Sequence, residues 1–196
     1  WNIHRIISLI QNSFYFSFIV TSNMNLKRII AEYPNFPKKG ILFRDFSPIL
    51  ADPSAMSFVV EEFAKQFHPR DVDTFVGIES RGFIIASTLA QKYGKGMVML
   101  RKEGKLPGKT VKTSYTIEYG KAVLEIQKNV LKEGERVIIC DDLLATGGTA
   151  SAAAKLVEGI GAKVGGFAFI IELTDLNGIK EISNYKTVSL VQYWWL

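Results

Sequence analysis

The sequence predicts an α/β fold, a doubly wound and mainly parallel sheet flanked by helices. Short apolar runs typical of buried strands alternate along the chain with longer segments whose apolar residues recur at helical spacing. This alternation is typical of parallel sheets with helices on both faces. One apolar run, at 137–140, leads through a turn of small residues into an alanine-rich segment, as in the strand-to-helix junctions of such folds. Hydrophobic residues make up 47% of the 196 residues, which is sufficient for one globular core.

Residues 1–23 differ from the rest of the chain. They lack an initiator methionine and contain two apolar patches, Ile6–Ile10 and Phe14–Val20, with polar residues between them. The polar break argues against a membrane-spanning helix, which needs about 20 mostly apolar residues. A signal peptide is the alternative, but no small-residue cleavage site follows. We expect Met24 to be the natural start, residues 1–23 to be a non-native or mis-annotated extension, and residues 24–196 to form a single domain.

The remaining elements are predicted in chain order. A short amphipathic helix at 26–32 is followed by a loop region that runs to Pro53. Further on, helical spacing of apolar residues predicts helices, and compact apolar runs predict strands. The predicted helices are 54–67, 82–93 and 149–160, and the predicted strands are 74–78, 97–100, 137–140, 164–171 and 187–191.

Residues 101–120 interrupt the alternation. They carry five positive charges and several glycines but little apolar periodicity. Loops of this length in compact domains are commonly lids over a binding site. We therefore predict a long flexible lid loop; the alternative is a solvated β-hairpin with surface lysines.

The segment Val137–Thr149 combines groups that suit a phosphorylated sugar. Its small-residue turn, at the start of a predicted helix, leaves main-chain N–H groups free to bind phosphate, and threonine hydroxyls add donors. Asp141 and Asp142, just before the turn, repel phosphate but accept hydrogen bonds from hydroxyls and bind Mg²⁺. The implied ligand is a ribose 5-phosphate, with the acids at the ribose or the metal. The residues predicted to bind the 5-phosphate are Ala145, Thr146, Gly147, Gly148 and Thr149.

A second strand-to-helix junction lies at 77–82. Ser80 and the glycine at its end permit close approach of an anion to the main chain, while the Arg81 guanidinium binds two phosphate oxygens at once. This composition suits a pyrophosphate, although Glu79 and Arg81 also fit a plain surface ion pair. In the loop ahead of the sheet, Phe43 is a candidate to stack on a heterocycle whose ring nitrogens are read by main-chain groups.

With these segments the chain resembles the adenine phosphoribosyltransferases, a branch of the type I phosphoribosyltransferase family, from about Asn35 to Tyr193. The Leu-Glu-Ile-Gln run at 124–127 and the Arg-Lys-Glu-Gly-Lys-Leu-Pro run at 101–107 are more specific to this branch than the ribose-phosphate signature is. Residues 1–23 and the last three residues depart from the family. The segments that carry the resemblance are 36–45, 79–83, 101–108, 118–121, 124–127, 137–149 and 172–174.

The resemblance implies transfer of the phosphoribosyl group of phosphoribosyl pyrophosphate to adenine, giving AMP and pyrophosphate, in a cytoplasmic homodimer with an N-terminal hood. It implies that Glu118 exchanges a proton with the purine, that Mg²⁺ is held by substrate oxygens with Asp141 as a candidate ligand, and that the Glu79–Ser80 peptide is cis. The residues assigned to pyrophosphate are Ser80, Arg81, Arg101, Lys102 and Lys105, and those assigned to adenine are Phe43, Arg44 and Leu173.

Other functions were weighed against this one. The formal charge of +5 and pI near 9.2 do not indicate nucleic-acid binding, because the basic residues are dispersed except between 101 and 112. Cys140, the only cysteine, is predicted to be a buried spectator. The alternatives are a phosphoribosyltransferase for xanthine, hypoxanthine or guanine, and a non-catalytic regulator that senses phosphoribosyl pyrophosphate. No membrane partner is expected.

Overall fold

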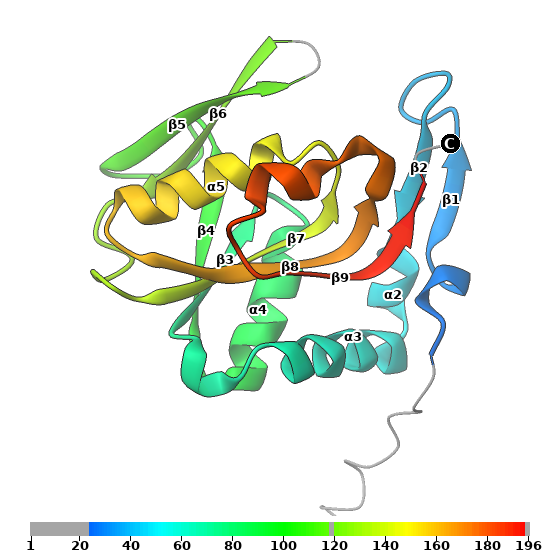
Figure 1. The fold of residues 1–196 in the computed structure, drawn as a ribbon, viewed down its shortest axis with the longest axis horizontal. Coiled ribbons are helices and arrows are strands. Elements are labelled where there is room, and N and C mark those ends of the chain that lie inside the picture. The colour runs from blue at the N-terminus through cyan, green and yellow to red at the C-terminus, as the bar shows by residue number, and fades with distance from the viewer. Residues whose placement is uncertain (1–23, 118–119, 195–196) are drawn as a thin grey trace, which may run out of the picture.

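A seven-stranded sheet forms the centre of the computed structural model, which describes residues 24–117 and 120–194 (Figure 1). The strand order is β5-β6-β4-β3-β7-β8-β9. Five neighbouring strands are parallel: β4 (Gly96–Lys102), β3 (Thr74–Ile78), β7 (Arg136–Leu144), β8 (Lys163–Leu173) and β9 (Thr187–Tyr193). Two antiparallel strands, β5 (Thr110–Ile117) and β6 (Gly120–Gln127), extend the sheet beyond β4.

Helices cover both faces of the sheet, so the predicted doubly wound α/β fold is confirmed. Helix α4 (Gly82–Tyr93) connects β3 to β4, and α5 (Gly148–Gly159) connects β7 to β8 on the opposite face (Figure 1). Helix α3 (Pro53–Gln66) begins at Asp52, whose side chain accepts the N–H groups of Ser54 and Ala55. Short 3-10 turns connect the remaining elements: η2 (Pro69–Asp71), η3 (Thr174–Leu176) and η4 (Gly178–Ile182).

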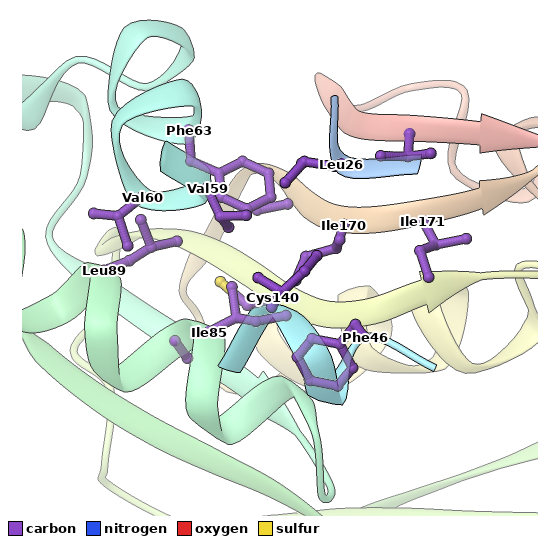
Figure 2. Packing of buried hydrophobic residues seen from close by; sticks show 14 of the residues in the cluster. Leu26, Phe46, Val59, Val60, Phe63, Ile85, Leu89, Cys140, Ile170 and Ile171 are labelled. Carbon is purple, nitrogen blue, oxygen red and sulfur yellow. The ribbon is translucent and has the colours of Figure 1, made fainter. Parts of the chain in front are cut away.

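Two hydrophobic cores lie on the two faces of the sheet, because successive strand residues point to opposite sides. Along β7, Ile138 and Cys140 pack with α3 and α4, whereas Val137 and Ile139 pack with α5. Figure 2 shows the first core, where residues of α3 and α4 meet Cys140. Cys140 is fully buried, as predicted for a spectator, and burial raises the pKa of its thiol.

The region before α3 differs from the prediction. Instead of a helix at 26–32, the chain forms a single 3-10 turn, η1 (Leu26–Arg28), and then β1 (Ala31–Pro34), which pairs with β2 (Leu42–Asp45). A short helix, α2 (Ser47–Ala51), follows within the predicted loop. Antiparallel pairing with β2 satisfies main-chain groups that a helix would otherwise have bonded internally. We call β1 and β2 the hood.

The predicted lid loop is also largely strand. Strands β5 and β6 form an antiparallel hairpin, and Val111 and Tyr115 of β5 pack against the core beneath α5. The prediction failed because polar residues outnumber apolar ones in β5, although Val111 and Tyr115 are four positions apart and therefore lie on one face of the strand. The alternative of a hairpin is correct for the secondary structure, but the inner face packs on the protein. Flexibility of this segment stays a prediction.

Most other boundaries agree with the prediction within two residues, and those of β3 and α4 agree fully. The exception is β7, which continues to Leu144 instead of ending at Cys140, so both acids lie on a strand. Within the described residues, no helix has the length and apolar character needed to cross a membrane.

The close contact between β3 and α4 leads to a prediction about the stability of the fold. A Cβ on Gly77 would lie 2.8 Å from the carbonyl oxygen of Gly82 and 2.9 Å from Phe83 Cα, which are main-chain atoms that cannot rotate away. Gly77→Ala should therefore lower the free energy of unfolding by about 1–3 kcal/mol. Urea denaturation measures this, with Gly96→Ala on the neighbouring strand as control, since nothing lies within 4 Å of its added Cβ. Equal stabilities of the two variants would contradict the packing argument.

Candidate active site

The candidate site lies at the carboxyl ends of the parallel strands β3, β4, β7 and β8. Register pairs Ile78 with Leu100 at the ends of β3 and β4, and Leu144 with Glu172 near the ends of β7 and β8. The segments that follow these strands therefore meet at one edge of the sheet, where open α/β sheets bind ligands.

The two acids of β7 form a close and buried pair. Asp142 is 6% exposed, and its main-chain N–H donates to Asp141 Oδ1 at 2.9 Å. Burial raises the pKa of both carboxyl groups, and the charge of Asp142 raises that of Asp141 further. Arg81 Nη1 lies 2.8 Å from Asp142 Oδ2 and opposes the rise for Asp142. The pair therefore lacks sufficient compensating charge and suits a ligand that brings hydroxyl donors or a cation.

The turn after β7 has the form of an anion site. Gly147, with a φ of 81°, occupies the N-cap of α5, and no side chain caps the helix. The first N–H groups of α5 therefore have no partner within the helix. The turn is packed tightly from behind, since a Cβ on Gly147 would lie 2.4 Å from the carbonyl oxygen of Gly178 in η4. The structure thus places all five predicted phosphate-binding residues, 145–149, in one rigid turn at a helix N-terminus.

A cleft of about 430 Å³ runs beside this turn along α5. Its α5 residues recur at the spacing of one helix face, which is a signal that sequence reasoning could have used. The side chains that line it are mostly hydroxyl-bearing or charged, and β5 contributes two of them. The lining residues are Ser114, Tyr115, Thr146, Gly148, Ser151, Ala152, Lys155 and Glu181.

Three predicted pyrophosphate residues gather around Glu79 at the end of β3. The Glu79 carboxylate is 8% exposed and forms ion pairs with Lys105 Nζ and with Arg101 Nε, the latter at 3.3 Å. It also accepts the N–H of Lys102 at 3.0 Å. The alternative of a Glu79–Arg81 surface pair is therefore wrong, because each side chain has other partners. The carboxylate therefore holds the cations Arg101 and Lys105 next to Ser80.

The main chain brings the two junctions together. A Cβ on Gly82 would lie 2.3 Å from the carbonyl oxygen of Cys140 and 3.2 Å from Asp141 Cα. Only glycine permits α4 to start this close to β7, and Arg81, one residue earlier, thereby reaches the acids. The Glu79–Ser80 peptide is cis, as the resemblance implied.

The hood supplies an aromatic side chain to this edge of the sheet. Phe43 is half-buried, contacts Phe36 edge-on with ring centroids 5.2 Å apart, and has the Arg81 guanidinium carbon 5.2 Å from its own ring centroid. One aromatic ring of the hood thus borders Arg81, which in turn pairs with the acid Asp142. This position suits a planar ring attached to the ribose.

Arg44 and Leu173, the other two residues assigned to adenine, are largely buried and contact other residues of the protein. The Arg44 side chain is 7% exposed, forms an ion pair with Glu32 at 2.9 Å, and lies 4.2 Å from the Tyr193 ring centroid. Its side chain therefore interacts with Glu32 and Tyr193 within the framework. Leu173 is 4% exposed in the first core and pairs with Tyr193, whose ring contacts Arg44 of the hood. The hood lies beside the end of β9 (Figure 1).

Sequence reasoning missed two side chains of this region. Glu125 and Gln127 on β6 bind the turn that carries Lys105. The signal was the alternation of the Leu-Glu-Ile-Gln run, which places both polar residues on one face of a strand. Glu118, the predicted catalytic residue, lies outside the described residues.

Comparison with known proteins decides the family. A model of the phosphoribosyl transferase domain matches residues 49–195. The chain is also 71% identical over 170 residues to the adenine phosphoribosyltransferase of Nitrosopumilus maritimus, a match covering 87% of this chain and all of that protein. The chain belongs to the adenine phosphoribosyltransferase family.

Solved structures of this family have the same fold. The adenine phosphoribosyltransferase of Thermoanaerobacter pseudethanolicus is 46% identical with a TM-score of 0.83, and the match covers 86% of this chain and 98% of that one. The Saccharomyces cerevisiae adenine phosphoribosyltransferase, complexed with an imino-altritol bisphosphate and adenine, is 43% identical with a TM-score of 0.81, covering 85% and 96%.

The Glu79 cluster makes a pH prediction. Burial raises the pKa of Glu79, but hydrogen bonds from Lys105, Lys102 and Arg101 lower it by more, from an ordinary 4.5 to about 2. A lowered pKa stabilises the fold above pH 4.5, and this contribution is lost as the pH falls toward 2. Glu79→Gln should therefore be less stable than wild type at pH 7, with the difference shrinking between about pH 5 and pH 2. Urea titrations at several pH values measure it; a pH-independent difference would refute the assignment.

Proposed function

We propose that this chain transfers the 5-phosphoribosyl group of phosphoribosyl pyrophosphate to adenine, giving AMP and pyrophosphate. The observation that carries the proposal is the junction of β7 and α5, where a buried acid pair directly precedes an uncapped helix N-terminus. This order matches the ribose hydroxyls and 5-phosphate of one ligand. Membership of the adenine phosphoribosyltransferase family supports adenine as the acceptor.

In the proposed reaction, adenine N9 forms a bond to C1′ of the ribose while the bond from C1′ to the pyrophosphate oxygen breaks, with inversion. The electron pair leaves with pyrophosphate, and the N9 proton leaves the purine. Since the transition state resembles a ribosyl cation, stabilisation of the leaving group's charge dominates catalysis. We assign this role to the cation cluster at the end of β3 and to its neighbours: Arg81, Arg101, Lys102 and Lys105.

We propose Mg²⁺ as the cofactor. Among the described residues, no three acidic, histidine or cysteine side chains are grouped to hold a metal ion. The buried pair Asp141 and Asp142 nevertheless fits a cation, because burial and mutual repulsion leave its negative charge poorly compensated. Substrate oxygens would complete the coordination, as Mg²⁺ sites built on phosphates usually do. When bound, the ion supplies positive charge to the pyrophosphate.

We further propose that the β5–β6 hairpin closes over the substrates and brings Glu118 to the purine, where it exchanges a proton. Base recognition is assigned to the Phe43 ring, the Arg44 main chain and Leu173. The alternative acceptors, hypoxanthine, guanine and xanthine, carry an oxo group that typically faces a lysine. The hood instead offers an aromatic ring and a buried arginine side chain that is already paired.

A cytoplasmic homodimer is the proposed form of the protein. Ile84 on α4 is 39% exposed and Met99 on β4 is 41% exposed. Met99 pairs with Gly77, and Gly77 packs against Gly82 and Phe83 at the start of α4, the helix that carries Ile84. Exposed apolar side chains on these neighbouring elements suit contact with a second copy. We propose no nucleic-acid or membrane partner.

Steady-state kinetics with phosphoribosyl pyrophosphate, Mg²⁺ and each of adenine, hypoxanthine, guanine and xanthine test the proposal. We expect turnover with adenine to exceed that with the oxopurines by orders of magnitude in kcat/KM. Preference for an oxopurine would identify a different acceptor. Tight binding of phosphoribosyl pyrophosphate without turnover of any base would indicate the regulator.

Asp141→Asn should separate stability from function. Because its pKa is raised in the folded state, ionised Asp141 destabilises the fold at neutral pH, and the contribution falls away below its ordinary value of 3.8. The asparagine keeps the acceptor for the Asp142 N–H, so the unliganded variant should have a higher Tm at pH 7. A hydrogen bond to a charged group is worth about 1.5–3 kcal/mol, so losing the charged acceptor should raise the KM for phosphoribosyl pyrophosphate roughly tenfold to hundredfold. An unchanged KM would disprove the ribose or metal contact.

Glu118→Gln should preserve shape but cannot carry the exchanged proton. We expect kcat to fall much more than the affinity for phosphoribosyl pyrophosphate, by about 10²-fold or more. Hydrogen exchange across 101–120, with and without phosphoribosyl pyrophosphate, tests closure in parallel. Undiminished turnover of the variant, or identical exchange in both states, would argue against this role of the hairpin.

A further inference from the structure

The Leu-Glu-Ile-Gln run of β6 places two apolar side chains on one face of the strand and two polar side chains on the other. Leu124 and Ile126 are 1% and 0% exposed in the core under α5. Glu125 and Gln127 alternate with them and point to the other side of the sheet, toward the turn between β4 and β5. The apolar pair explains the burial of the strand, and the polar pair requires a different explanation.

Four hydrogen bonds connect the polar pair to this turn. Glu125 Oε1 accepts the main-chain N–H of Lys105 at 3.0 Å and that of Leu106 at 3.1 Å. Its Oε2 accepts the hydroxyl of Thr110 at 3.1 Å. Gln127 Nε2 donates to the carbonyl oxygen of Pro107 at 3.0 Å. The turn 105–110 is thus held from its start to its end by two side chains of one strand.

The Glu125 carboxylate is an unusual group to bury for structural reasons alone. It is 2% exposed, and burial raises its pKa, but the hydrogen bonds from the turn and the charge of Lys112 lower it by more. The carboxylate therefore stays ionised at neutral pH. Burying an ionised carboxylate is costly unless its oxygens are satisfied, and all three of its hydrogen-bond donors come from the turn. The hydrogen bonds that compensate for burying this carboxylate are therefore the same bonds that fix the conformation of the turn.

Lys105 is the charged residue that this shape positions. Its N–H is bound by Glu125, its carbonyl oxygen accepts Arg101 Nη1 at 3.1 Å, and its Nζ pairs with Glu79. Arg101 also lies opposite Glu125 in the register of β4 and β6. The lysine is fixed at three points although its side chain is exposed, which lowers the entropy lost when it binds an anion.

We infer that Glu125 is a positioning residue that fixes Lys105 in the pyrophosphate subsite, and that Gln127 supports the same turn from its far side. The inference rests on the proposed function only for the identity of the anion. Glu125 does not touch the substrate. It acts through the main chain of Lys105, so its loss should weaken pyrophosphate binding without altering recognition of the base.

The test is a double-mutant cycle read by calorimetry of inorganic pyrophosphate with Mg²⁺, together with KM values for both substrates. Glu125→Ala should raise the Kd of pyrophosphate and the KM of phosphoribosyl pyrophosphate about tenfold, with the KM of adenine unchanged. In the Lys105→Ala background, Glu125→Ala should have little further effect, because the residue acts through that lysine. Glu103→Ala is the matched control, since this exposed acid of the same segment pairs with Lys112.

Gln127→Ala keeps the proposal testable if Glu125→Ala does not fold. This partly exposed side chain loses one hydrogen bond, so a few-fold rise in the pyrophosphate Kd is expected, again only when Lys105 is present. Additive effects with Lys105→Ala, or an equal rise in the KM of adenine, would overturn the inference, as would a wild-type protein that does not bind pyrophosphate. Pyrophosphate binding without AMP formation would instead refute the proposed function alone.

Discussion

Parallel pairing of β3 with both β4 and β7 is the constraint on which the site depends. It brings the carboxyl ends of three strands to one edge of the sheet, so that residues about 60 positions apart in sequence become neighbours. The strand ends form one site only because α4 begins very close to the sheet. Gly77 and Gly82 leave no room for a Cβ, and this close approach places Arg81 against Asp142.

Charge is distributed unevenly along this edge. On the β3 and β4 side, Glu79 has several cationic partners and a lowered pKa. On the β7 side, Asp141 and Asp142 face Arg81 and have raised pKa values. A ligand with a strongly anionic end and a hydroxyl-bearing middle matches this order, because the anion competes for the cations while the hydroxyls satisfy the acids. The electrostatics and the family assignment therefore agree.

The hairpin of β5 and β6 belongs to the body of the protein as well as to the site. Ile126 and Leu124 anchor it in the core under α5, and Glu125 shapes the turn at its base. A segment held this firmly at its base is suited to present charged groups at fixed positions.

The sequence by itself determined the α/β class, the bounds of β3 and α4, and the turn of small residues that opens α5, because periodicity and turn composition are local properties of the chain. The tertiary structure decided which groups meet. Whether Glu79 pairs with Arg81 or with Arg101 depends on the register of β4 beside β3, and the exposure of Arg44 depends on hood docking at Tyr193. Strand β5 was not predicted because its few apolar residues give little periodicity in the sequence. Its apolar face becomes recognisable only in the fold, where Val111 and Tyr115 pack against the core formed with α5 and β6.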